Sequence, residues 1–79
     1  MIPLYGFLQG DTIGTLVLAE DDDTAQILAD KVQASARLRV PTSPRVRLLY
    51  RGHAVDLDAT VLQLGIQALE RIDVVRETP

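Results

Sequence analysis

The sequence predicts an α+β fold in which a mixed sheet of about four to five strands carries one helix packed across one face. Alternating or apolar segments that end in glycine-containing turns stand at both ends of the chain, which is typical of antiparallel hairpins. Between them, one segment repeats its apolar residues at helical spacing. No repeat or linker interrupts this order, so we expect a single domain over residues 1–76, with a loose end at 77–79.

The composition limits the kind of protein that this chain can be. Of its 79 residues, 47% are hydrophobic and 24% are charged, as in ordinary globular domains. It has no cysteine, a net charge of -3 and no apolar run near the ~20 residues that cross a bilayer. We also expect no leader segment before the first strand. We therefore expect a cytoplasmic protein that has no disulfide and binds neither membranes nor nucleic acid.

The first hairpin is expected to join a strand at 2–8 to a strand at 13–19 through a tight turn. Both faces of the first strand are apolar, so its alternation does not tell which face meets the core. The second strand has the same ambiguity. Gly14 is expected to form a bulge that switches the register of the second strand midway.

The helix is expected to begin at Asp23, because Asp23 and Gln26 have the spacing of a capping box. Its apolar stripe predicts the core face: Ala25, Leu28, Ala29, Val32 and Ala36. Its other side predicts a solvent face: Gln26, Asp30, Lys31 and Gln33. The acidic run before the helix is better explained by the positive end of the helix dipole than by a metal site.

Pro41 and Pro44 separate the helix from a central strand at 45–51. One parity of that strand is expected to pack on the helix: Val46, Leu48 and Tyr50. The other parity is expected to face outward: Arg45, Arg47, Leu49 and Arg51. A short return strand should end near Asp56, and a single helical turn should lie between Thr60 as its cap and Gly65 as its end.

The last strand, expected at 69–76, should turn Ile72 and Val74 inward and Arg71, Asp73 and Val75 outward, and should lie beside the first strand. The chain offers little chemistry for catalysis, since it has one histidine and no cysteine. We interpret His53 as a solvated turn residue, and we find no phosphate loop or metal site. No enzymatic activity and no cofactor are therefore expected in this chain.

From end to end the sequence resembles ubiquitin. The resemblance is carried by short motifs in the same order: 8–13 (LQGDTI), 23–24, 31–32, 47–52 (RLLYRG), 60–61, 65–67 and 72–75 (IDVV). It implies the β-grasp fold, which agrees with the elements read from the pattern. The chain ends without the Gly-Gly that conjugation requires, so we expect no covalent attachment to other proteins.

The chain also resembles the gamma subunit, component B, of toluene-4-monooxygenase-type hydroxylases. The shared motifs are 23–24, 29–32 (ADKV), 39–41 (RVP), 45–47 (RVR) and 69–75 (LERIDVV). This resemblance implies a noncatalytic subunit that binds the large subunit of a bacterial diiron hydroxylase of aromatic hydrocarbons. The diiron centre would then lie in the partner.

Two hypotheses follow for the function. In the first, the protein is such an accessory subunit, and its exposed apolar and arginine residues form the interface. In the second, it is a free ubiquitin-like adaptor, for example of a type VII secretion system. The residues expected to bind the partner are Leu8, Arg45, Arg47, Leu49, Arg51 and Val75.

Overall fold

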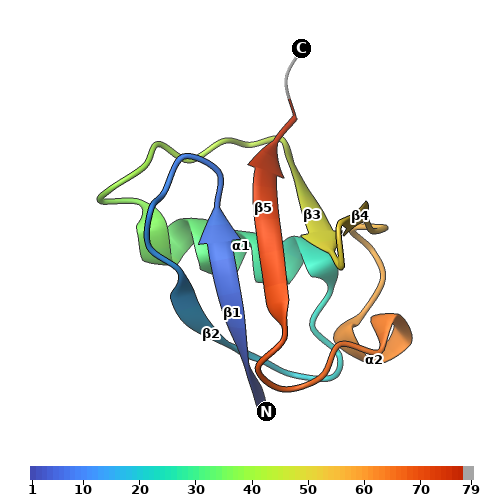
Figure 1. Ribbon diagram of the computed structural model, residues 1–79. Coiled ribbons are helices and arrows are strands. Elements are labelled where there is room, and N and C mark those ends of the chain that lie inside the picture. The colour runs from blue at the N-terminus through green and yellow to red at the C-terminus, as the bar shows by residue number, and fades with distance from the viewer. Residues whose placement is uncertain (78–79) are drawn as a thin grey trace.

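The computed structural model describes residues 1–77 and shows a five-stranded sheet in the order β2-β1-β5-β3-β4 (Figure 1). The strands are β1 (Ile2–Leu8), β2 (Thr15–Ala19), β3 (Val46–Tyr50), β4 (His53–Ala54) and β5 (Arg71–Arg76), and the helices are α1 (Ala25–Ala36) and α2 (Val61–Leu64). β5 lies between β1 and β3, parallel to the first and antiparallel to the second. The predicted mixed sheet, and the pairing of the last strand with the first, are confirmed.

The core lies between the sheet and α1, which crosses behind the sheet in Figure 1. The predicted apolar stripe of α1 is fully buried. It meets inward side chains from four strands: Leu4, Leu8, Val17, Val46, Leu48, Ile72 and Val74. Neither of the described helices is long and apolar enough to cross a membrane.

The expected bulge at Gly14 is wrong. β2 begins at Thr15, after Gly14, and pairs with β1 in an unbroken register from Gly6 opposite Thr15 to Ile2 opposite Ala19. Gly14 instead lies against the ring of Phe7, where an added Cβ atom would sit 2.6 Å from two ring carbons. Close packing, rather than a register switch, is what requires glycine at this position.

Two expectations for α1 are also corrected. The N-cap is Thr24, whose hydroxyl accepts from the amide of Ile27 at 3.2 Å. Asp23 instead accepts from the amide of Glu20 at 2.9 Å and from Lys31 Nζ at 2.8 Å. Gln33, expected to face water, is only 7% exposed, because its side-chain amide bonds the backbone of the loop beyond the helix.

The second half of the chain follows the prediction closely. Thr60 and Gln63 form a complete capping box at α2, and Gly65 ends this helix with a φ of 70°. The last strand begins at Arg71, two residues later than expected, and the amide of Glu77 donates to the carbonyl of Arg45 at 3.0 Å. Residues 78 and 79 lie outside the described part of the chain, so the loose end expected at 77–79 stays a prediction.

Candidate partner-binding surface

The face of the sheet opposite α1, which we call the open face, is the surface turned toward the viewer in Figure 1. Strand alternation and the observed register determine which side chains lie on it. They are Pro3, Tyr5, Phe7, Leu16, Leu18, Arg47, Leu49, Arg71, Asp73 and Val75.

The part of the open face formed by β1 and β2 is apolar. Tyr5 lies opposite Leu16, and Pro3 lies opposite Leu18. The side chains of Tyr5, Leu16 and Leu18 are 46%, 58% and 51% exposed. Exposed apolar side chains that lie next to one another in this way are a common feature of surfaces that bind another protein.

The part formed with β5 carries fixed charges. The guanidinium carbon of Arg71 lies 4.0 Å from the centroid of the Phe7 ring, a cation–π contact. Arg71 Nη2 also donates to Asp73 Oδ1 at 2.8 Å, and this hydrogen bond raises the pKa of Arg71. A hollow of about 220 Å³ lies beside them, bounded by Val75 and by the turn at 9–11.

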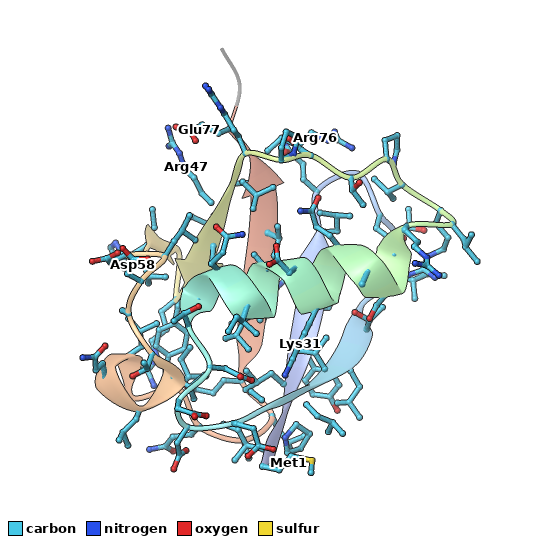
Figure 2. All side chains as sticks on the ribbon, turned by 180° about the vertical axis from the view of Figure 1, so that it is seen from behind. Met1, Lys31, Arg47, Asp58, Arg76 and Glu77 are labelled. Atoms are coloured by element: carbon cyan, nitrogen blue, oxygen red, sulfur yellow. The ribbon has the colours of Figure 1, made fainter. Side chains whose placement is uncertain are left out.

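The structure places three of the predicted partner-binding residues on the open face: Arg47, Leu49 and Val75. Arg47 lies opposite Val75, and Leu49 lies opposite Asp73. Arg47 is exposed and has no ion pair within residues 1–77. Figure 2 shows it at the same end of the molecule as Glu77. Arg45 is exposed and immediately precedes β3.

The surface position expected for Leu8 is wrong. Leu8 is only 3% exposed and belongs to the core cluster. It shares the parity of Leu4 and Gly6, and this parity faces α1, since Gly6 packs against Val32. Leu8 therefore stabilises the fold and is not available to a partner.

Arg51 also departs from the expected outward set. β3 ends at Tyr50, and Arg51 takes a left-handed backbone conformation with a φ of 53°. Its guanidinium lies over the ring of Tyr50, 5.2 Å from the centroid, and donates to Glu70 Oε1 at 2.8 Å. Arg51 is thus held in an intramolecular cluster with side chains of the inward parity.

Glu70 is the centre of this cluster. The hydroxyl of Tyr50 and the backbone amide of Gln67 donate to Oε2, and Arg51 donates to Oε1. These donors, Tyr50 first, lower the pKa of Glu70 to about 2. Burial, followed by the bond to this carboxylate, raises the pKa of Tyr50. The cluster fixes the entry into β5 and leaves no free functional group that suggests a reaction.

The arginines that are close in sequence are separated in space. Arg39 Nε donates to Asp11 Oδ1 at 3.2 Å and Arg39 Nη2 donates to Asp11 Oδ2 at 2.9 Å, and this pairing lowers the pKa of Asp11. Arg51 belongs to the Glu70 cluster. Within residues 1–77, no three His, Asp or Glu side chains are placed together to hold a metal ion.

Sequence reasoning missed the largest apolar contribution to the open face, which comes from Tyr5, Leu16 and Leu18. Both parities of β1 and β2 are apolar, so periodicity did not identify the outward one. Gly6 was the available signal, because a glycine within a strand marks a close approach of another element, and that element is α1.

The fold and the open face define a ubiquitin-like domain with a surface suited to another protein. Solved structures agree with this class. Ubiquitin of Caldiarchaeum subterraneum matches with a TM-score of 0.79 and 19% identity, over 99% of this chain and 95% of that chain. A chain from a structure on the molecular mimicry of SUMO in DNA repair matches with a TM-score of 0.77 and 18% identity, over 94% and 89% of the two chains.

The family model of toluene-4-monooxygenase system protein B (TmoB) matches residues 1–75, and the chain belongs to this family. A chain in the structure of a toluene 4-monooxygenase HD complex with the inhibitor 4-bromobenzoate is similar over 96% of this chain and 98% of that chain. Its TM-score is 0.87 and its identity 25%. The protein is therefore a small accessory subunit of a monooxygenase of this type. Among curated proteins, no sequence matches this chain.

Proposed function

We propose that this chain is noncatalytic and docks on the large hydroxylase subunit of a bacterial multicomponent aromatic-hydrocarbon monooxygenase. The observation that carries the proposal is the family match over residues 1–75, supported by the likeness to a chain of the toluene 4-monooxygenase complex over nearly the full length of both. This match favours the accessory-subunit hypothesis over the adaptor hypothesis.

The open face is the surface that we assign to docking. It combines an exposed Tyr side chain with arginine, two residue types that contribute strongly to binding at protein interfaces, and its exposed Leu side chains add apolar area. Arg47 and Leu49 extend this surface onto β3. Burying the apolar side chains against a partner removes them from water, at roughly 25 cal/mol for each Å² of apolar surface.

In this proposal the protein works in the cytoplasm as a protein-binding subunit, and the diiron centre belongs to its partner. In the same proposal the chain itself binds no cofactor.

Co-purification tests the proposal. The tagged chain is produced together with the hydroxylase polypeptides of a toluene-4-monooxygenase-type system, and the complex is isolated through the tag. We expect the large subunit to co-elute with the chain in size-exclusion chromatography. Recovery of the free chain alone, from cells that contain folded hydroxylase, would refute the proposal.

A further inference from the structure

The outer edge of β2 has backbone groups without partners in the sheet. β2 is the first strand in the order β2-β1-β5-β3-β4, so only one of its sides is paired (Figure 1). The described chain does not continue the sheet beyond it. An edge of this kind is a template for another strand.

The hydrogen bonds of β1 identify which groups of β2 point outward. The amide of Tyr5 donates to Glu70 at 3.0 Å, and the amide of Leu69 donates to the carbonyl of Pro3 at 2.7 Å. The backbone groups of Pro3 and Tyr5 therefore point toward β5. Those of the alternate residues, Leu4 among them, point toward β2.

Opposite residues in an antiparallel pair either exchange both hydrogen bonds or exchange none. Val17, opposite Leu4, is therefore bonded to β1, whereas Leu16 and Leu18 direct their N–H and C=O groups to the free edge. Lys31 supports this assignment, because its Nζ reaches the carbonyl of Leu18 at 2.7 Å from α1. Figure 2 shows Lys31 on α1 next to β2.

Lys31 of α1 occupies one acceptor of this edge, the carbonyl of Leu18, and β2 itself carries no other protection against pairing. β2 has the sequence TLVLA, without charge or proline. Beside it lies a groove of about 380 Å³ between β2 and α1, lined by Leu16, Val17, Leu18, Lys31, Ala34 and Ser35. The small side chains of Ala34 and Ser35 leave this space open next to the unpaired backbone.

We propose that an extended, apolar segment of the hydroxylase partner adds a sixth strand to the sheet along β2. This inference rests on the docking proposed above and names the structural element that docks. The outward backbone N–H and C=O groups of β2 can form a row of main-chain hydrogen bonds with an extended segment. Alternate side chains of the added strand would meet the groove on one side and the exposed Leu16 and Leu18 on the other.

Amide hydrogen exchange on the complete chain, free and in complex with the hydroxylase, tests the inference. We expect the amides of Leu16 and Leu18 to exchange quickly in the free chain and slowly in the complex. The amide of Val17, bonded to β1, is the internal reference that is protected in both states. A stable complex in which Leu16 and Leu18 exchange as in the free chain would overturn the added strand while leaving docking intact.

Two other results are distinguishable from that one. Absence of any complex would refute the proposed function, and the added strand with it. Protection of the same amides in the free chain that increases with its concentration would assign the edge to a second copy, and would also overturn the inference.

A pair of variants tests the backbone separately from the side chain. Leu16→Pro removes an outward N–H that makes no bond to β1, and proline is tolerated in edge strands. It is expected to weaken hydroxylase binding by roughly tenfold or more beyond the effect of Leu16→Ala, which keeps the N–H. Equal affinities of the two folded variants would contradict the added strand. If Leu16→Pro does not fold, the exchange measurement on the native chain still decides.

Discussion

Gly6 in β1 packs so closely against Val32 in α1 that a Cβ atom at position 6 would lie 2.5 Å from Val32 Cγ2. We expect Gly6→Ala to destabilise the protein by about 1–3 kcal/mol, because a well-packed core does not accept the added methyl group. Combining it with Val32→Ala should recover part of this cost. Urea unfolding of both single variants and the double variant measures the coupling, and strict additivity would show that the two residues are not in tight contact.

Leu48 lies in the middle of β3 and is fully buried against α1. Leu48→Ala is expected to lower the free energy of unfolding by about 2–5 kcal/mol, since it removes core contacts and leaves a cavity. Leu38→Ala makes the same chemical change at a side chain that is 94% exposed, and should alter stability by less than about 0.5 kcal/mol. Similar unfolding midpoints for the two variants would contradict the assigned parity of β3.

Gln33 ties the helix to the loop that leads to β3. Its Nε2 donates to the carbonyl of Ser43 at 2.9 Å, and its Oε1 accepts from the amide of Ser43 at 2.7 Å. Gln33→Ala leaves both backbone groups without this partner and should cost about 1–3 kcal/mol. Gln26→Ala, which removes only a bond to Asp30 on the helix surface, should cost about 0.2–0.5 kcal/mol. Faster exchange of the Ser43 amide in the first variant alone would locate the effect.

The contrast between Gln33 and α2 shows what the sequence can and cannot reveal. Thr60, Gln63 and Gly65 act within one helical turn, so their spacing alone predicts the capped helix that the structure contains. Gln33 is buried by a bond to Ser43, ten residues beyond it, and no local pattern predicts this contact. The polar side chain of Gln33, and not its helical spacing, is what led to the expectation that it faces solvent, since it stands four residues after Ala29 and three before Ala36.

The candidate surface shows the same contrast between positions that the sequence predicts and positions that depend on tertiary contacts. In β3 only one parity is consistently apolar, so alternation correctly places Arg47 and Leu49 outward. In β1 both parities are apolar, and the choice between Leu8 and Tyr5 depends on where α1 crosses the sheet. Arg51 was misplaced because its partner Glu70, 19 residues away, and its positive φ both lie beyond the reach of strand alternation.

Glu70 makes stability depend on pH in a defined direction. Its pKa in the folded protein is about 2, below the ordinary value of 4.5, so its contribution is complete above pH 4.5 and is lost as the pH falls toward 2. Tyr50→Phe removes the first donor to this carboxylate. We expect the variant to show a higher Glu70 pKa by NMR titration and a smaller loss of stability over this pH range. An unchanged Glu70 pKa would show that Tyr50 does not control it.

Arg47 and Leu49 test the open face as the docking surface. Arg47→Glu and Leu49→Asp should each weaken hydroxylase binding by roughly tenfold or more, if they lie at the centre of the interface, and leave a near-native circular dichroism spectrum. Arg47→Glu is the cleaner change because it lies opposite Val75, whereas Leu49→Asp places a second carboxylate opposite Asp73. Arg37→Glu makes the same charge change at the exposed C-cap of α1, away from the open face, and should bind like the native chain. Unchanged affinity of a folded Arg47→Glu variant, measured by titration calorimetry, would place the interface elsewhere and leave the β2 edge as the remaining candidate.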